Sequence, residues 1–144
     1  MPLKIGLVGC GAIGTEIAKA IDSEEIDADL VAVCDHNPET ATALINGLQG
    51  KPVRAKLEDL VRLSDLVVEA ASQRAVPAIA RATLVKGKSL ITPPTQAGVL
   101  EEYGVQVIGV EVDAIKRGED RQAFKDTMTM LGLEMPKSAV ATSL

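Results

Sequence analysis

The chain has 144 residues, of which 47% are hydrophobic and 24% charged, a composition that fits one globular domain and leaves no room for a second full one. The formal net charge of -5 and the near absence of aromatic residues, one Tyr and one Phe, argue against nucleic acid as a partner. No run approaches 18 consecutive apolar residues and no signal-peptide pattern is present, so we expect no membrane partner and a cytoplasmic location.

The chain opens on an apolar strand that runs into three glycines. Residues 4–14 read Lys-Ile-Gly-Leu-Val-Gly-Cys-Gly-Ala-Ile-Gly, with the last three glycines at G-x-G-x-x-G spacing. In a dinucleotide-binding turn the first glycine permits the tight turn, the second lets backbone N–H groups approach a pyrophosphate, and the third lets the next helix pack on its strand. That helix presents unpaired N–H groups to the anion. The predicted contacts in this turn are Gly9, Gly11, Ala12, Ile13 and Gly14.

A second apolar run, residues 30–34, ends in Asp35, 21 residues beyond Gly14. A carboxylate there can accept hydrogen bonds from the adenosine ribose hydroxyls, and it would repel the additional phosphate of NADP. No arginine follows, which favours NAD, but NADP stays an alternative because His36 or Asn37 could contact a phosphate. The simpler interpretation is a tight strand-to-helix turn in which Asp35 is a solvated loop acid.

Alternating elements follow. Asn37 and Pro38 predict the N-cap and first turn of a helix that ends near Gly47 or Leu48. We then expect strands at 53–55, 66–69 and 89–91, which alternate with helices at 57–61 and 73–85. Gly87 is expected to end the second of these helices. Because strands and helices alternate, the predicted fold class is α/β, a Rossmann-like doubly wound parallel sheet with three αβα layers.

The pattern changes at 92–97, a proline-rich stretch that can continue neither a central strand nor a helix. Beyond it we expect a short helix over 98–103, a sixth strand over 105–108 and an amphipathic helix over 119–131, followed by a strand-like tail. One continuous sheet is the expected result. The predicted domain organisation is therefore a single Rossmann-like NAD(P)-binding domain over 1–144 with a seam near 92–97.

Four stretches of the first 91 residues form a more specific pattern. They are the glycine turn, Lys-Ala-Ile-Asp at 19–22, Val-Cys-Asp at 33–35 and, above all, Val-Glu-Ala-Ala-Ser-Gln-Arg-Ala-Val at 68–76. On these, residues 3–91 resemble the N-terminal, NAD(P)-binding half of the L-aspartate dehydrogenase family. In that family the loop after the fourth strand lies toward the nicotinamide ribose, so the resemblance implies that Ala71 and Ser72 contact the cofactor. An N-cap on the following helix is the alternative role for Ser72.

The end of the chain carries a different resemblance. Gly-Val-Leu-Glu-Glu-Tyr-Gly-Val at 98–105, Ile-Gly at 108–109 and Asp-Ala-Ile-Lys-Arg-Gly-Glu-Asp-Arg-Gln-Ala-Phe at 113–124 are similar to the large subunit of carbamoyl-phosphate synthetase. There the segment joins a small Rossmann-like domain to an ATP-grasp domain, and the arginine that matches Arg121 contacts ATP. This sequence has no ATP-grasp domain, so we expect Arg121 in a salt bridge or on a solvated helix face. The change of family at the seam suggests a chimera, natural or engineered.

The sequence offers no catalytic residue. Nothing after Thr92 matches the half of the dehydrogenase family that carries its catalytic histidine, and His36, the only histidine, lies on the adenosine side of the expected cofactor. We therefore expect an NAD(P)-binding domain without turnover as it stands. The alternatives are a structural or engineered scaffold with an empty site, and a true NAD-dependent L-aspartate dehydrogenase. If the chain is active, it is an oxidoreductase of that type.

Cys10 and Cys34 fall in neighbouring elements of this fold. A disulfide is one option, but two reduced thiols packed near the cofactor site fit a cytosolic protein better. One histidine and two cysteines make no convincing zinc site, so no metal ligand is predicted. A homodimer is a further expectation, since a second copy could complete the site. The full set of predicted cofactor contacts is Gly9, Gly11, Ala12, Ile13, Gly14, Asp35, His36, Ala71 and Ser72.

Overall fold

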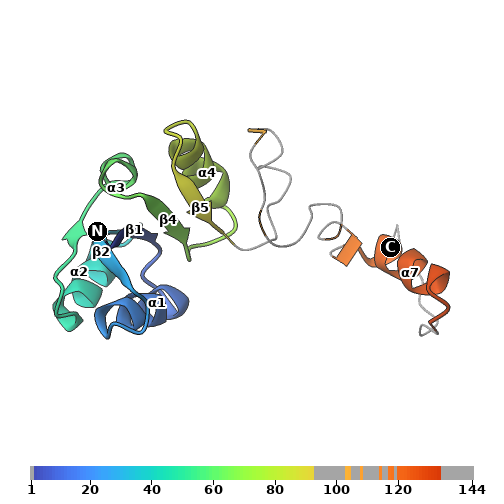
Figure 1. Cartoon of the computed structure of the whole chain (residues 1–144), viewed down its shortest axis with the longest axis horizontal. Helices are drawn as coiled ribbons and strands as arrows, with labels where there is room; N and C mark the ends of the chain where they lie inside the picture. Colours follow the sequence, from blue (N-terminus) through green and yellow to red (C-terminus); the bar gives the residue numbers. More distant parts are fainter. Residues whose placement is uncertain are drawn as a thin grey trace. The chain divides into compact units, whose positions relative to one another are not determined.

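In the computed structural model, residues 2–92 alternate strands and helices as the sequence predicts (Figure 1). The elements are β1 (Leu3–Val8), α1 (Ala12–Asp22), β2 (Ala28–Cys34), α2 (Pro38–Gly47), β3 (Val53–Arg54), α3 (Leu57–Leu63), β4 (Leu66–Glu69), α4 (Val76–Leu84) and β5 (Ser89–Ile91). The strands are parallel, in the order β3-β2-β1-β4-β5. The strands β2 and β3 thus lie on one side of β1, and the strands β4 and β5 lie on its other side. A topological switch point lies between β1 and β4.

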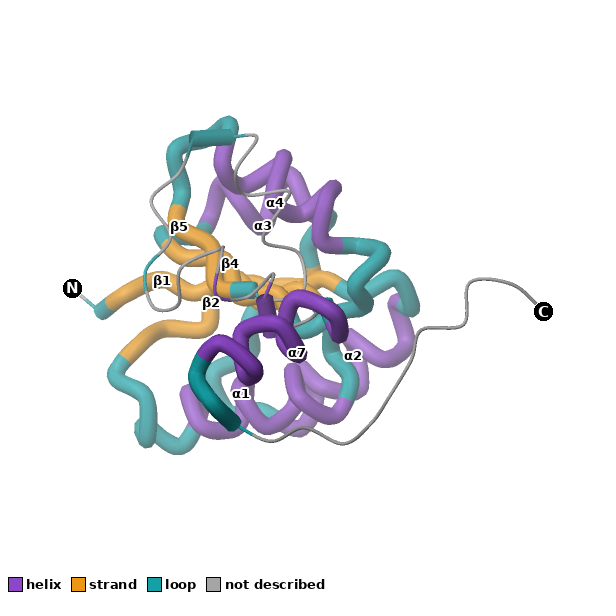
Figure 2. The backbone as a smooth tube through the Cα atoms, turned by 90° about the vertical axis from the view of Figure 1, so that its right-hand side faces the viewer, coloured by secondary structure: helices purple, strands orange, loops and turns teal. Residues whose placement is uncertain are grey.

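Helices cover both faces of the sheet and give the three predicted layers (Figure 2). On one face α1 and α2 pack around Leu7 and Val33. On the other, α3 and α4 pack around Val8 and Ala32. Neighbouring residues of β1 and β2 therefore point into two separate cores, which is why these strands are apolar at successive positions rather than alternating with polar residues.

Local signals set most of the boundaries. Asn37 caps α2, because its side-chain oxygen accepts a hydrogen bond from the backbone N–H of Glu39 at 2.9 Å. Gly87, at φ +66°, follows α4 as expected. However, α4 begins at Val76 rather than Gln73, and the N-cap role considered for Ser72 is wrong. The chain first makes a separate turn, in which the N–H of Ala75 donates to the Ser72 carbonyl at 2.8 Å.

The structure describes residues 2–92, 103–104, 108, 114, 117–118 and 120–133. They belong to two compact units, Met1–Val105 and Gln106–Leu144, which we treat separately. In the second unit, α7 (Arg121–Met130) is capped by Asp120, whose carboxylate accepts the N–H of Ala123 at 2.7 Å. Gly132, at φ +73°, follows this helix.

Several predictions lie outside the described residues. They include the strand-like tail and, apart from a turn at Tyr103 and Gly104 and the single residue Ile108, the helix over 98–103 and the strand over 105–108. The side chain of Arg121 also lies outside them. The continuous sheet and the single domain over 1–144 stay predictions.

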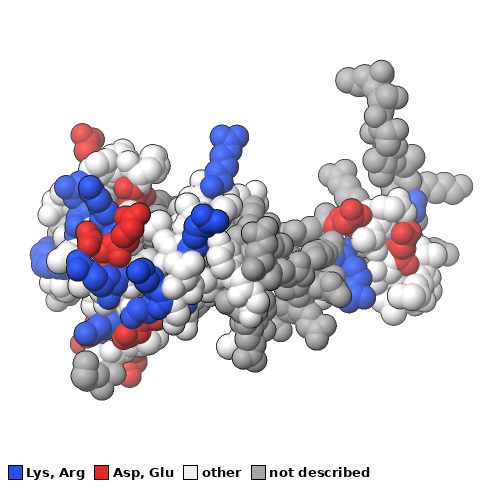
Figure 3. Space-filling model, turned by 90° about the horizontal axis from the view of Figure 1, so that it is seen from above, with Lys and Arg blue, Asp and Glu red and all other residues white. Residues whose placement is uncertain are grey.

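The surface of the first unit carries charges of both signs. Figure 3 shows Lys and Arg interspersed with Asp and Glu over the face of this unit that it presents, with no large patch of either sign there. Among the residues that the structure describes, no helix is both long and apolar enough to span a bilayer.

Candidate functional site

A cavity of about 590 Å³ opens at the carboxyl ends of β1, β2 and β4, where an open parallel sheet of this order binds its ligand. Its volume lies within the range of small-molecule sites. Six of the nine predicted cofactor contacts line it, and they come from three strand ends that are far apart in the sequence. These six are Gly9, Gly11, Asp35, His36, Ala71 and Ser72.

The three glycines of the turn do three different things. Gly9 has φ +99°, and a Cβ on it would lie 2.5 Å from the carbonyl carbon and oxygen of Ala70, so the end of β1 touches the β4–α4 loop directly. A Cβ on Gly14 would overlap the carbonyl oxygen of Gly9, so this glycine lets α1 pack on its strand. A Cβ on Gly11 would meet no atom within 4 Å. Gly11 therefore faces open space, as a turn that approaches a ligand requires.

The N-terminus of α1 lies beside this opening. Gly11 is its N-cap residue and provides no side-chain hydrogen bond, and the first bond of the helix runs from the N–H of Thr15 to the carbonyl of Gly11 at 2.8 Å. The N–H groups of Ala12, Ile13 and Gly14 consequently have no acceptor within the helix. Ile13 is 69% exposed, and the buried face of α1 is formed by Gly14, Ala18 and Ile21 instead.

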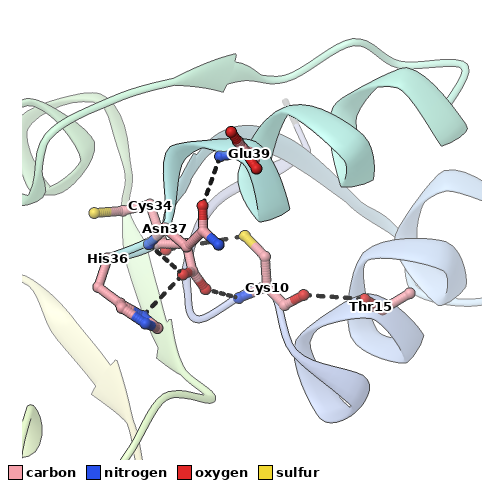
Figure 4. A network of polar contacts seen from close by, with 7 residues as sticks. Cys10, Thr15, Cys34, His36, Asn37 and Glu39 are labelled. Atoms are coloured by element: carbon pink, nitrogen blue, oxygen red, sulfur yellow. Dashed lines mark hydrogen bonds and ion pairs between the residues drawn. The ribbon is translucent and has the colours of Figure 1, made fainter.

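Asp35 joins the end of β2 to the glycine turn, and Figure 4 shows three of the residues that contact it, Cys10, His36 and Asn37. Its Oδ2 accepts the N–H of Cys10 at 2.7 Å, and its Oδ1 accepts the N–H of Asn37 at 2.8 Å and lies 3.0 Å from Nδ1 of His36. The carboxylate is only 8% exposed, whereas the His36 side chain is 97% exposed. The interpretation of Asp35 as a solvated loop acid is therefore wrong. Since a carboxylate offers about four acceptor positions, this one keeps capacity for a ribose hydroxyl.

Cys10 and Cys34 are both free thiols. The Sγ of Cys10 lies 4.0 Å from the carbonyl oxygen of Cys34, and the sulfur of Cys34 points away from Cys10 (Figure 4). Burial, and then the charge of Asp35, raise the pKa of Cys10 to about 11. The same two causes raise the pKa of Cys34. Both thiols are thus protonated at neutral pH. Within the described ranges, no group of three His, Cys, Asp or Glu residues could hold a metal ion.

Sequence reasoning missed Glu69, the last residue of β4, which is 4% exposed. Its Oε1 accepts the N–H of Ala71 at 2.7 Å, and its Oε2 accepts the hydroxyl of Thr92 at 2.9 Å. A signal for it was present, because Glu69 ends an apolar strand in the same way that Asp35 follows β2.

Comparison with known proteins supports a dinucleotide-binding fold. The family described as "Homoserine dehydrogenase, NAD binding domain" matches residues 9–120. The L-aspartate dehydrogenase of Methanosarcina mazei is 49% identical over 90 residues, which cover 62% of this chain and 33% of that protein. The N-terminal section of the carbamoyl phosphate synthase large chain of Aquifex aeolicus is 32% identical over 155 residues, covering 98% of this chain and 26% of that protein. The WlbA dehydrogenase of Bordetella pertussis, solved in complex with NADH and UDP-GlcNAcA, superposes with a TM-score of 0.60 at 26% identity, covering 74% of this chain and 36% of that one.

Both resemblances expected from the sequence are confirmed, and so is the Rossmann-like fold class. The chain spans about one third of the length of the aspartate dehydrogenases that it matches. The synthetase relative, however, aligns with almost the whole chain and not only with 98–144, so the two resemblances overlap in the first unit. A seam at 92–97 is therefore not needed to explain the second resemblance, and a chimera stays a hypothesis.

Proposed function

The chain belongs to the family of homoserine dehydrogenase NAD-binding domains, and on that premise we propose that it binds NAD in the cavity at the switch point. The adenosine ribose lies at Asp35, the pyrophosphate at Gly11 and the N-terminus of α1, and the nicotinamide half along Ala71 and Ser72. One observation carries this assignment, namely that a single cavity is lined by these residues from the ends of β2, β1 and β4, which are adjacent in the sheet. Ala12, Ile13 and Gly14 contribute backbone N–H groups to the pyrophosphate.

The charges around the cavity favour NAD over NADP. Asp35 sits where the additional phosphate of NADP would lie, and no Lys or Arg belongs to the lining within the described part of the chain. Among the described residues, His36 is the one residue of the lining with a basic side chain. It supplies a weaker contact for NADP, which we propose as the second-best ligand.

We further propose that this chain binds the cofactor without turning over a substrate. Hydride transfer needs a substrate held against the nicotinamide and a group that moves a proton. The described lining on the nicotinamide side consists of small and apolar residues, among which Ser72 carries the one hydroxyl. The ionisable side chains of the described lining, Asp35 and His36, lie on the adenosine side. An active NAD-dependent L-aspartate dehydrogenase is the second candidate, because of the 49% identity to such an enzyme. A homodimer is proposed as the assembly, since Ile91 of the edge strand β5 is 54% exposed.

Calorimetric titration with NAD and NADP tests the proposal on the wild-type chain and three variants. Asp35→Ala should weaken NAD binding by about tenfold or more, through the loss of charge-assisted hydrogen bonds. Gly11→Val should abolish binding by filling the space for the pyrophosphate. Asp59→Ala removes an exposed carboxylate on α3 that pairs with Arg62, and serves as the matched control with wild-type affinity.

Two results would contradict the proposal in different ways. If the wild-type chain is not saturated at about 5 mM NAD, its affinity is weaker than any specific cofactor site requires. That result would refute NAD binding. L-Aspartate-dependent formation of NADH, followed by its absorbance, would refute the absence of turnover and favour the second candidate.

A further inference from the structure

Among the described residues, Glu69 is the charged residue that is most deeply buried as a whole, at 4% exposure, and unlike Asp35 it does not line the cavity. Burying a carboxylate is unfavourable unless hydrogen bonds compensate it. Both of its oxygens are engaged, one by the N–H of Ala71 at 2.7 Å and the other by the hydroxyl of Thr92 at 2.9 Å. The bond from the Ala71 N–H is short, and the bond from the Thr92 hydroxyl has an ordinary O–H···O length.

The two partners of Glu69 belong to different segments. Ala71 lies in the β4–α4 loop, and Thr92 directly follows β5, which pairs with β4 in parallel. The carboxylate therefore ties the loop to the end of the neighbouring strand. On its other side the loop is held by β1, because the N–H of Ala70 donates to the Val8 carbonyl at 2.8 Å.

The β4–α4 loop, fixed in this way, forms one wall of the cavity. Among the three strand ends that line the cavity, the end of β4 is the one furthest from Asp35. Asp35 follows β2, Gly11 follows β1 and Ser72 follows β4, and these strands are adjacent in the order β2-β1-β4. An extended dinucleotide with its adenosine ribose at Asp35 and its pyrophosphate at Gly11 must continue over the end of β4. Its nicotinamide half then lies against Ala71 and Ser72.

We propose that Glu69 is a positioning residue of the cofactor cavity. Its carboxylate fixes the position of the backbone at Ala71 and Ser72, which line the cavity. Through Thr92 it also links this part of the loop to the end of β5. The residue acts on the nicotinamide half of the cofactor and not on the adenosine half. This inference rests on the proposed function, because it concerns the cavity in which NAD is proposed to bind.

The test compares two ligands that share one half. NAD and ADP both carry the adenosine ribose and a pyrophosphate, but ADP lacks the nicotinamide riboside. In Glu69→Ala the N–H of Ala71 loses its acceptor, so NAD affinity measured by calorimetry should fall roughly tenfold. ADP affinity should stay within about twofold, because Asp35 and Gly11 are untouched.

Two further variants separate positioning from general stability. In Glu69→Gln the amide oxygen can still accept from Ala71 and the amide N–H can donate to the Thr92 hydroxyl, so NAD affinity should return to within about threefold of wild type. Thr92→Val removes the coupling to β5 while leaving the loop bond, and should lower NAD affinity about threefold with ADP unchanged. Thermal unfolding of each variant is recorded alongside.

Equal losses of NAD and ADP affinity in Glu69→Ala would overturn the inference, because they indicate a general loss of structure. An unchanged ratio of NAD to ADP affinity in all three variants would overturn it as well. If Glu69→Ala does not fold, Thr92→Val decides by the same ratio. Failure of the wild-type chain to bind NAD would refute the proposed function and this inference together, whereas wild-type binding with an unchanged ratio would refute the inference alone.

Discussion

Replacing Gly9 or Gly11 by alanine adds the same methyl group at two positions of one turn. We expect the first replacement to lower the stability of the fold and the second to lower the affinity for NAD. At Gly9, φ is +99°, and the methyl carbon would lie 2.5 Å from the carbonyl group of Ala70. A backbone conformation of this kind costs a non-glycine residue about 1–3 kcal/mol. Displacing packed backbone costs about 1–3 kcal/mol more. We expect Gly9→Ala to lower the free energy of unfolding by about 2–6 kcal/mol.

At Gly11 the backbone has an ordinary φ of -73°, and the added methyl group would meet no atom within 4 Å. The free energy of unfolding should therefore fall by only about 0.5–1 kcal/mol, the difference between glycine and alanine at an N-cap. The methyl group would instead occupy the space proposed for the pyrophosphate. NAD affinity should fall by about tenfold or more, equivalent to about 1.4 kcal/mol.

Urea unfolding followed by circular dichroism measures the first effect, and calorimetric titration with NAD measures the second. Gly9→Ala should shift the urea midpoint strongly and Gly11→Ala should not. The reasoning fails if Gly9→Ala unfolds at the wild-type midpoint, or if Gly11→Ala loses as much stability as Gly9→Ala. Wild-type NAD affinity in Gly11→Ala would contradict the position assigned to the pyrophosphate.

Three further predictions concern single side chains. The Thr83 hydroxyl is buried and has no hydrogen-bond partner in the described part of the chain. Thr83→Val keeps the shape of the side chain and should therefore raise the free energy of unfolding by about 1 kcal/mol in urea melts. A loss of stability would contradict this prediction. The N–H groups of Gln49 and Gly50 hold the pKa of Asp22 below its ordinary value of 3.8. A carboxyl group with a lowered pKa stabilises the fold above its unfolded pKa and loses that effect as the pH falls, so the stability advantage of wild type over Asp22→Asn should shrink between about pH 6 and pH 2, and a constant advantage would refute the assignment. Burial and the charge of the neighbouring acid raise the pKa of Cys34, so iodoacetamide should label it slowly at about pH 7; NAD should slow the labelling further because Cys34 lines the cavity, and faster labelling with NAD would argue against binding there.

The sequence predicts what depends on neighbours along the chain. The glycine spacing, the Asn37 cap and the apolar run of β4 are local patterns, and each element appears close to its expected position. The N-cap role of Ser72 was wrong because a separate turn before α4 uses its carbonyl instead. A propensity for capping cannot tell which of two turns a chain will make.

The contacts that complete the site are long-range, and this is where the sequence was insufficient. Asp35 was predicted as a ribose acid, but its bond to the N–H of Cys10 requires the parallel pairing of β1 with β2, in which Val8 is opposite Cys34. Glu69 was passed over because Thr92, its second partner, is 23 residues away and comes close only through the pairing of β4 with β5. Strand register, and not residue type, decides both contacts.

The contact between Gly9 and Ala70 has a consequence for protein engineering. Since the backbone of the β4–α4 loop fills the space where a Gly9 side chain would be, the glycine turn and this loop are shaped against each other. A designer who transplants residues 4–14 alone into another α/β sheet would carry over half of a matched pair. The smallest transferable part of this cofactor site is two adjacent strand ends, cut from distant places in the sequence and moved together.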